Sequence, residues 1–300
     1  YGLFTGGLGF HDGSTAMEMT TVPVAAGNTG RQLMLLQDFG ANVLASTPSY
    51  ALNIAEVAEA NGINLGAGPL RLAVCGAEPA TDAIRQEIAK RLGALVIDSY
   101  GLSEVMGPGV TGECLEGHLD DKTPGGLHLW EDHFVFEIID QQTGEPLPDG
   151  ELGELVITTL SKEALPMVRY RTGDITRIYA EPCVCGRTHR RMARVTGRND
   201  DMLIIRGVNL YPSLIEEALV GYPGVEPHYQ LVGRRKGALD TLDVEIEAAV
   251  SVKKTSYNAL ATKVSQHLKA KTGVTCKIVV RGPGKLPRSE GKAVRVKDLR

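Results

Sequence analysis

Three segments in the first hundred residues carry helix signals. Residues 31–40 and 81–93 each have apolar positions at helical spacing and stop at a glycine, as helices commonly do. A further helix is predicted to begin at Pro48. Thr47 is a good N-cap for it, and proline is favoured at the first helical position.

Compact apolar runs separate these helices. Residues 41–46, 70–76 and 94–101 are short and bounded by glycine or proline, which is typical of buried strands. The first 30 residues hold seven glycines and are predicted to form loops around short strands. Strands that alternate with helices predict a parallel α/β sheet.

The pattern changes after Gly109. Residues 134–160 predict a hairpin of β-branched strands, and short strands continue to about residue 196. Helices and strands then alternate in a compact α+β pattern. We therefore predict a large α/β domain with a β-rich subdomain over residues 1–196, and a small C-terminal α+β domain over residues 197–300.

The charge balance argues against two classes of partner. The chain has 300 residues, with 32 basic and 36 acidic side chains and a net charge of −4, so neither nucleic acid nor an anionic membrane is indicated. No apolar run is long enough to span a bilayer, and no signal peptide is visible. Five cysteines form an odd, sparse set, unlike a secreted disulfide framework. A cytoplasmic location is expected.

One glycine-rich segment places a ring, a hydroxyl and a carboxylate on loose backbone. Residues 99–109 read SYGLSEVMGPG, and glycine at this density lets a chain approach a ligand closely. The alternative is a turn after a buried strand. Four more glycine-marked stretches accompany it: CGAEP (75–79), YRTGD (170–174), GRNDDMLIIRGVNLYP (197–212) and LPRSEGKAVRV (286–296).

In this order and spacing, the five stretches resemble the adenylate-forming superfamily. The wordings YGLFTGGLG, GAEP, WEDHF and RGVNLYP also resemble the phenylacetate–CoA ligase family. The resemblance covers essentially the whole chain and implies an adenylate-forming α/β domain with a mobile C-terminal lid. Family members carry a Ser/Thr/Gly-rich phosphate loop upstream of the region where this chain starts. We interpret the chain as a fragment, because it begins at Tyr1 and its downstream motifs are intact.

The resemblance implies a two-step reaction. An aryl carboxylate attacks the α-phosphate of ATP, giving an acyl-adenylate and pyrophosphate, and a thiol then attacks the adenylate carbonyl. The first step brings two anions together, so it needs cations and positioning. ATP or AMP, Mg²⁺ and coenzyme A are the cofactors implied.

The resemblance also assigns a nucleotide site. Tyr100 would lie against adenine, although alone it would be read as a packed core tyrosine. The backbone edge facing the base would come from Gly76, Ala77, Glu78 and Pro79. Ser103 would offer its hydroxyl to the phosphate, and Glu104 would offer a hard oxygen ligand to Mg²⁺.

Four further positions serve the ribose and the lid. Asp174 would accept from both ribose hydroxyls, with a turn aspartate as the alternative, and Arg198 would reach the ribose or a phosphate. Asp200 matches the family's hinge, about which the lid turns. Lys292 would act as a mobile cation between the carboxylate and the α-phosphate, where a lone lysine is otherwise a solvated surface charge.

The acid pocket is assigned to Phe4, Ala77, Ser99 and Pro108. Phe4 and Pro108 offer flat apolar walls suited to an aromatic ring. Ser99 departs from the bulkier aliphatic residue that the family pattern leads us to expect, which enlarges the pocket and adds a hydroxyl. This favours a hydroxy- or amino-substituted aryl acid, unless Ser99 faces the backbone.

The cysteines suggest a metal. Cys183 and Cys185 form a Cys-x-Cys pair, which is half a zinc site. Some relatives add a cysteine after the Gly-Pro-Gly motif and a histidine before EDHF. These correspond to Cys114 and His128, with His118 as the rival histidine. Such a set would hold a structural Zn²⁺, and the alternative is four side chains without metal.

Three classes of function compete. An aryl acid–CoA ligase leads, and an enzyme that loads a carrier protein's pantetheine thiol shares every motif. The basic segments RGVN (206–209) and GRRKG (233–237) would meet CoA phosphates or an acidic carrier. A binding module or inactive chain is supported only by the Cys-x-Cys pair and the missing phosphate loop. A homodimer stays open.

Overall fold

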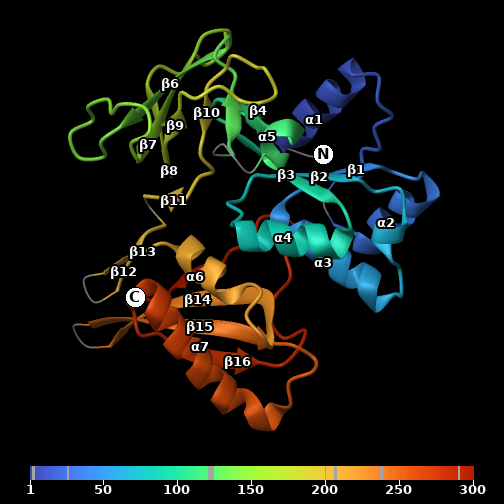
Figure 1. The fold of residues 1–300 in the computed structure, drawn as a ribbon, viewed down its shortest axis with the longest axis vertical. Coiled ribbons are helices and arrows are strands. Elements are labelled where there is room, and N and C mark those ends of the chain that lie inside the picture. The colour runs from blue at the N-terminus through green and yellow to red at the C-terminus, as the bar shows by residue number, and fades with distance from the viewer. Residues whose placement is uncertain are drawn as a thin grey trace.

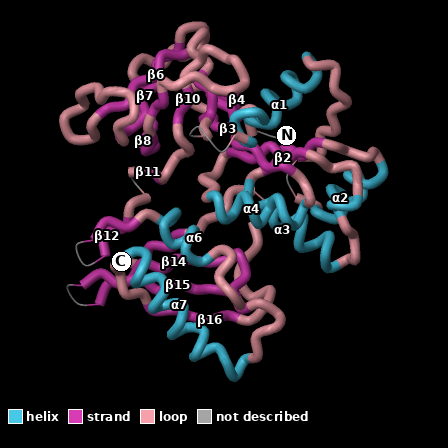
Figure 2. Tube along the Cα trace, in the orientation of Figure 1, coloured by secondary structure: helices cyan, strands magenta, loops and turns pink. Residues whose placement is uncertain are grey.

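The computed structural model arranges the chain in three groups of elements: an α/β group, a group rich in strands, and a C-terminal group (Figure 1). The structure describes residues 1, 4–25, 27–120, 125–199, 201–205, 208–236, 239–289 and 291–300. In Figure 2, the group around β6, β7 and β8 consists of strands and loops, whereas the other two groups also carry helices.

The helices of the described residues are α1 (Thr5–Ala16), α2 (Thr29–Asp38), α3 (Pro48–Ala60), α4 (Asp82–Leu92), α5 (Leu115–Leu119), α6 (Pro212–Leu219) and α7 (Tyr257–Thr272), with short 3₁₀ turns η1 (Leu65–Ala67) and η2 (Lys254–Ser256). The predicted start of α3 is confirmed, because Thr47 accepts from the backbone N–H of Tyr50 as its N-cap. Helix α4 ends as predicted, with Gly93 in the left-handed conformation.

The first sheet is mixed and has seven strands in the order β1-β2-β3-β4-β5-β10-β9. Its members are β1 (Val43–Ser46), β2 (Leu72–Gly76), β3 (Leu95–Leu102), β4 (Met106–Glu113), β5 (Leu127–Leu129), β9 (Ile178–Tyr179) and β10 (Arg191–Met192). Strands β1, β2 and β3 are parallel, as predicted, and β4 returns antiparallel to β3. The carboxyl ends of β2 and β3 therefore lie at the same edge.

The second sheet has the order β11-β8-β7-β6. Its strands are β6 (Phe134–Ile139), β7 (Gly153–Thr159), β8 (Tyr170–Thr176) and β11 (Gly197–Arg198). The predicted hairpin is the antiparallel pair β6 and β7.

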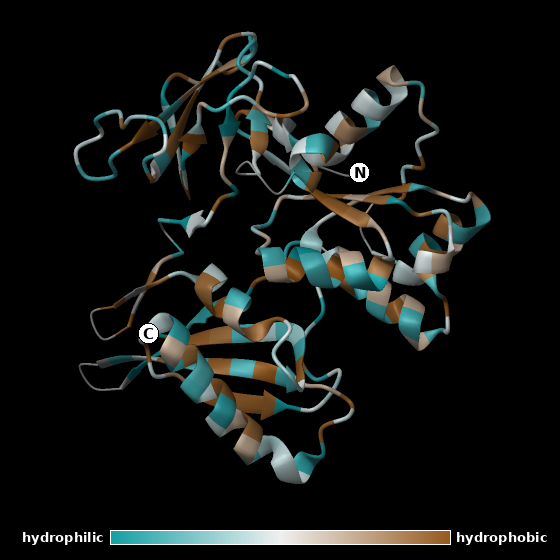
Figure 3. Cartoon of the chain, in the orientation of Figure 1, coloured by the Kyte–Doolittle hydropathy of each residue, from teal (hydrophilic) through white to brown (hydrophobic). Residues whose placement is uncertain are grey.

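The C-terminal lid contains a four-stranded sheet in the order β16-β15-β14-β17 and a two-stranded sheet of β12 and β13. Its strands are β12 (Leu203–Ile205), β13 (Val208–Leu210), β14 (Val225–Lys236), β15 (Leu239–Ala248), β16 (Lys277–Arg281) and β17 (Val296–Asp298). Hydrophobic residues concentrate in the strands beside α7 (Figure 3). The long strand β14 was not predicted, because its sequence VEPHYQLVGRRK mixes proline and charges with apolar residues.

The prediction for the first 30 residues is wrong, because helix α1 replaces the expected loops and strands. Glycine is a poor helix former, but here it permits close packing. A Cβ at Gly9 would lie 2.7 Å from Pro108 Cδ, and one at Gly7 would lie 2.6 Å from the ring of Tyr1. Tertiary contact with Pro108 of β4 therefore outweighs local propensity.

The described residues form three apolar cores, one in the α/β group, one around the strands β4–β7 and one in the C-terminal group. Ile54, Ile84 and Ile88 are fully buried where α3 and α4 pack on the first sheet. Leu203, at the start of β12, already belongs to the core of the lid, whereas β11 still pairs with β8. The change of core thus falls in the segment where the boundary was predicted. Asp200, the predicted hinge, lies outside the described residues.

None of the helices in the described ranges is long and apolar enough to cross a membrane.

Candidate functional site

Three predicted nucleotide residues come together from three strands. Tyr100 stands near the end of β3, and Asp174 in β8 is directly opposite Arg198 of β11. The Tyr100 hydroxyl donates to Asp174 Oδ2 at 2.6 Å, and Arg198 Nη1 approaches Asp174 Oδ1 at 3.5 Å. Asp174 is only 7% exposed, so its carboxylate is fixed in place by the sheet.

The charge of Asp174 affects the rings around it. Burial, followed by this charge, raises the pKa of Tyr100 well above its ordinary value, so the phenol remains a hydrogen-bond donor. Burial and the charge of Glu104 raise the pKa of Tyr170, and Arg198 and Asp174 also act on that ring.

The turn between β3 and β4 presents Ser103 and Glu104, and both are exposed. Ser103 Oγ lies 3.0 Å from Thr5 Oγ1, which ties the turn to the start of α1. Lys162 Nζ donates to the backbone carbonyl of Glu104 at 2.5 Å and leaves its carboxylate exposed. An exposed carboxylate of this kind can serve as a hard oxygen ligand.

The GAEP stretch follows β2 at the same sheet edge. A Cβ at Gly76 would lie 2.3 Å from the carbonyl oxygen of Ser99, so only glycine lets the two strands approach this closely. Ala77 has φ +67° and is exposed, and Pro79 is exposed as well. The backbone of Gly76 and Ala77 thus remains open at the strand ends, as a base-binding edge requires.

The residues assigned to the acid pocket border the same region. Phe4 is 54% exposed at the start of α1, and Pro108 packs on that helix. Ala77 directly follows β2, and Ser99, which is partly exposed, lies in the neighbouring strand β3 opposite Gly76. Their membership of one pocket stays a prediction.

Lys292 comes to the large domain on a loop of the lid. The side chain is exposed, and among the described residues its ammonium group has no hydrogen-bond or ion-pair partner. Its neighbours in sequence are held on the large domain. Thr47 Oγ1 donates to the carbonyl oxygen of Gly291 at 2.9 Å, and the N–H of Ala293 donates to a carboxylate oxygen of Glu78.

A buried carboxylate that was not predicted also joins the two domains. Glu216 of α6 is 3% exposed and accepts from the N–H and the hydroxyl of Thr81, at 3.3 and 3.0 Å. The Tyr229 hydroxyl donates to its other oxygen at 2.8 Å, and Arg295 Nε lies 3.2 Å from that oxygen. A glutamate in an amphipathic helix is normally read as a solvated residue, so no local signal pointed to this contact.

The predicted metal ligands form one cluster. The donor atoms that lie within 4.8 Å of one another belong to Cys114, His128, Cys183 and Cys185. Two of the separations are 3.6 Å between the Sγ atoms of Cys114 and Cys183, and 3.4 Å from Cys185 Sγ to His128 Nε2. Ligand atoms around a tetrahedral Zn²⁺ are roughly 3.5–3.8 Å apart, so the cluster fits this metal.

The pKa values of His128 and Cys185 favour metal binding near pH 7, whereas that of Cys114 opposes it. Burial lowers the pKa of His128, which leaves its imidazole neutral near pH 7. Burial raises the pKa of Cys185, but hydrogen bonds from Arg187 and the neighbouring thiols outweigh this and lower it to about 7. By contrast, burial raises the pKa of Cys114 to about 12, so a metal ion must displace that proton.

His118 does not join the cluster. Its Nδ1 lies 3.1 Å from Arg85 Nη2 and 3.8 Å from Glu113 Oε2, in a network of charged side chains. The structure therefore places His128, and not the rival His118, with the cysteines.

The two basic segments were predicted to meet CoA phosphates or an acidic carrier. In the basic GRRKG segment, Arg234 and Arg235 pair with Asp243 and Asp240 at 3.0 and 2.8 Å, which reduces their free charge. In the RGVN segment, Arg206 lies outside the described residues.

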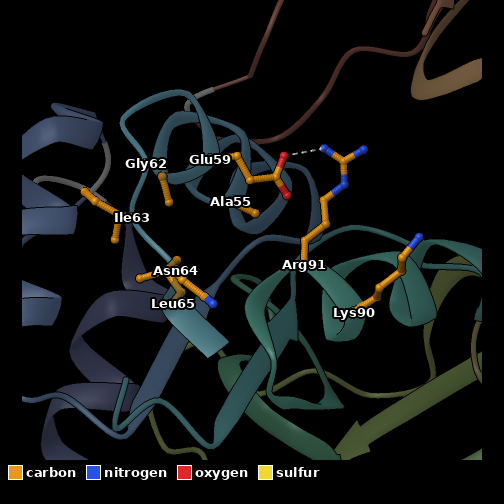
Figure 4. A pocket seen from close by; sticks show the side chains of 9 residues that line it. Ala55, Glu59, Gly62, Ile63, Asn64, Leu65, Lys90 and Arg91 are labelled. Atoms are coloured by element: carbon orange, nitrogen blue, oxygen red, sulfur yellow. Dashed lines mark hydrogen bonds and ion pairs between the residues drawn. The ribbon is translucent and has the colours of Figure 1, made fainter. Parts of the chain in front are cut away.

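A cavity of about 350 Å³ lies between α3 and α4 and is closed partly by Glu59 and Arg91 (Figure 4). None of the predicted nucleotide or acid residues lines it. This cavity is therefore not the predicted site.

Two family descriptions match the chain. Residues 10–161 match the AMP-binding enzymes, and residues 207–300 match the AMP-binding enzyme C-terminal domain. These matches fall on the large domain and on the lid.

Curated relatives are similar over the whole chain. A phenylacetate-coenzyme A ligase of Thermus thermophilus is 48% identical over 316 residues, which cover 100% of this chain and 70% of that protein. A phenylacetate-coenzyme A ligase of Escherichia coli is 47% identical over 304 residues, which cover 100% of this chain and 68% of that protein.

A solved structure distinguishes two arrangements of the domains. A 2-hydroxyisobutyryl-CoA ligase in its postadenylation state superposes with a TM-score of 0.92 at 28% identity, covering 99% of this chain and 64% of that one. The same ligase in its thioesterification state, with CoA, gives a TM-score of 0.63. The chain thus spans less than two thirds of that ligase, and its lid is placed as in the postadenylation state.

Proposed function

Because the chain belongs to the AMP-binding enzymes of the phenylacetate-coenzyme A ligase family, we propose that it serves an ATP-dependent aryl acid–CoA ligase. The acid is first activated as an acyl-adenylate, and the acyl group then passes to the thiol of CoA. The observation that carries this proposal is the meeting of Asp174, Tyr100 and Arg198, and the docking of the Lys292 loop on the large domain supports it.

We assign a role in the first step to each of four side chains. Asp174 is a buried acceptor for the ribose hydroxyls, and the ring of Tyr100 gives adenine a flat face. The exposed carboxylate of Glu104 would hold Mg²⁺, which neutralises charge on the phosphates. Lys292 then stands between the two anions that must meet, where a preorganised cation stabilises the transition state.

The second step takes place after the lid turns about the segment that holds Asp200. A cation that bridges carboxylate and phosphate acts mainly when these two groups react. We therefore assign Lys292 to adenylation and another face of the lid, near Arg206–Asn209, to entry of the thiol. CoA is the acceptor proposed, and a carrier protein's pantetheine is the second candidate, because it presents the same thiol.

The acid is proposed to be an aryl acid with a hydroxyl or amino substituent. Ser99 lies in the second half of β3 and is partly exposed, so its hydroxyl would offer one polar contact beside the apolar walls of Phe4 and Pro108. The test is ATP–pyrophosphate exchange by the full-length protein with phenylacetate, hydroxy- and aminobenzoates, and fatty acids. Exchange with substituted aryl acids is expected, and exchange with fatty acids alone contradicts the aryl assignment.

The four-residue cluster is proposed to hold one structural Zn²⁺. Its ligands come from the end of β4, from β5 and from the loop before β10, so a bound ion joins three segments beside the site. Reduced thiols of this kind persist in the cytoplasm, which supports a cytoplasmic location.

Elemental analysis tests this metal. About one zinc per chain is expected in protein purified without added metal, in keeping with a closed site of four ligands. His128→Ala should lose the ion and His118→Ala, the matched control, should keep it, because only His128 lies among the thiols. A folded wild-type protein without metal contradicts the proposal.

A further inference from the structure

The carboxylate of Glu78 connects the large domain to the loop that carries Lys292. Its Oε2 accepts from the N–H and the hydroxyl of Ser49, at 3.1 and 2.7 Å. Its Oε1 accepts from the N–H of Ala293 in the lid. One side chain therefore bridges the first turn of α3 and the residue directly after Lys292.

A second bond holds the other side of Lys292. Thr47, the N-cap of α3, donates its hydroxyl to the carbonyl oxygen of Gly291 at 2.9 Å. The peptide groups on both sides of Lys292 are thus fixed to the start of one helix. The partial positive charge of that helix terminus also favours a carboxylate at this place.

We propose that Glu78 is a positioning residue for adenylation: its carboxylate seats the Lys292 loop, so that the ammonium group points into the cleft. This inference rests on the proposed function. The side chain of Lys292 has many rotamers and, among the described residues, no partner of its own, so its direction depends on its backbone. A lid that turns away from α3 breaks both bonds, and the device then has no part in thioester formation.

Other contacts between the domains involve residues that do not flank Lys292 directly, such as Arg295, whose Nη2 lies 3.4 Å from Ser49 Oγ. Glu56 of α3 pairs with His228 and with Arg288, whose Nε lies 2.8 Å away. Arg91 of α4 pairs with Glu226 at 3.0 Å. These pairs dock the lid as a whole. Glu78 and Thr47 are the large-domain side chains that, among the described residues, bond the neighbours of Lys292. Within the lid, the N–H of Gly291 also donates to Ser289 Oγ at 3.2 Å. The two roles can therefore be separated by mutation.

The test compares Glu78→Gln with Glu56→Gln in the full-length protein. The amide keeps the shape of the side chain but turns one acceptor into a donor, which then faces an N–H. Adenylation, measured as the maximal rate of pyrophosphate exchange, should fall by about tenfold or more in Glu78→Gln. Thioester formation from synthetic adenylate should stay at the wild-type rate. Glu56→Gln should not produce this split.

A second readout does not require activity. Trypsin cleaves the bond between Lys292 and Ala293, and mass spectrometry locates the cut. Cleavage there should be faster in Glu78→Gln than in the wild type, and Glu56→Gln should chiefly expose Arg288 instead. If Glu78→Gln folds poorly, Thr47→Val, which removes the hydroxyl bonded to Gly291, should give the same local change.

The outcomes separate the two claims. Wild-type cleavage after Lys292 in both variants overturns the positioning role, and so does an equal loss in the two half-reactions. If none of the acids tested supports pyrophosphate exchange by the wild-type protein, the proposed function is wrong. Faster cleavage in Glu78→Gln would still support the role of Glu78 in holding the loop.

Discussion

Asp174 and Lys292, which we propose act on the same substrate, are held in place by different means. Asp174 is buried in the middle of β8, and its partners Tyr100 and Arg198 come from neighbouring strands. Lys292 is exposed on a loop whose backbone is held by the other domain. The first residue is fixed by the fold itself, whereas the second is fixed only while the lid stays closed. A sheet thus supplies binding groups that persist, and a loop supplies a group that can be withdrawn.

The largest effect should come from Lys292→Ala. Loss of one electrostatic stabiliser in the transition state should slow adenylation by about 10²–10³-fold. The thiol step on synthetic adenylate should be nearly unchanged, and so should the melting temperature, because the side chain is exposed. Single-turnover measurements of both half-reactions in the full-length protein check this.

Lys285→Ala is the matched control, since Lys285 is also an exposed lysine of the lid but lies outside the loop that meets α3.

Asp200→Pro should affect the two half-reactions in the opposite way, because proline stiffens the predicted hinge. It should slow the thiol step and spare adenylation, while Asp200→Ala should spare both. Equal losses in both steps for Lys292→Ala contradict a lid that turns.

The next largest effect is expected at Glu247, which holds the segment before Lys292 within the lid. Glu247 is 1% exposed and accepts from Arg288 and from two backbone N–H groups, those of Gly284 and Leu286. Burial raises the pKa of Glu247, but these hydrogen bonds outweigh it and lower the pKa to about 2. The folded state thus binds its proton less tightly than the unfolded chain, whose glutamate has a pKa of about 4.3.

Stability from Glu247 is therefore present above pH of about 4.3 and is lost as the pH falls toward about 2, by up to about 3 kcal/mol. Glu247→Gln should be less stable than the wild type near pH 7, and the difference should shrink through this window. Urea unfolding of both proteins at several pH values measures it. A difference that does not depend on pH contradicts the assignment.

The elements that position the site were partly predictable. Caps and apolar runs located α3, α4 and β1–β3 because these signals are local. Helix α1 is missed because its glycines are explained by tertiary contacts, such as Pro108 at Gly9 and the Tyr1 ring at Gly7, that the local sequence does not reveal. Strand β14 was missed because its neighbours on both sides, and not its own pattern, make it a strand.

The candidate site was also only partly predictable from the sequence. The resemblance identified Tyr100, Asp174 and the cysteine cluster, and the structure brings each set together. The contact of Glu78 with Ala293 joins residues 215 positions apart and has no signature in either segment. GAEP indicated only that the backbone of Glu78 faces the nucleotide, and its carboxylate proved to be the part that meets the lid.

The smallest effect is expected for a substitution in the sheet, at Tyr100. Tyr100→Phe keeps the ring that meets adenine and removes the hydroxyl that donates to Asp174 at 2.6 Å. A hydrogen bond to a charged group contributes about 1.5–3 kcal/mol, so the free energy of unfolding should fall by about 2 kcal/mol. Adenylation should change little once ATP is saturating, because the ribose hydroxyls supply new donors to the same carboxylate. Tyr170→Phe is the control, since among the described residues the Tyr170 hydroxyl has no hydrogen-bond partner. If Tyr100→Phe lowers the adenylation rate as much as it lowers stability, Tyr100 acts in the reaction itself. The division between a sheet that binds and a loop that reacts would then be wrong.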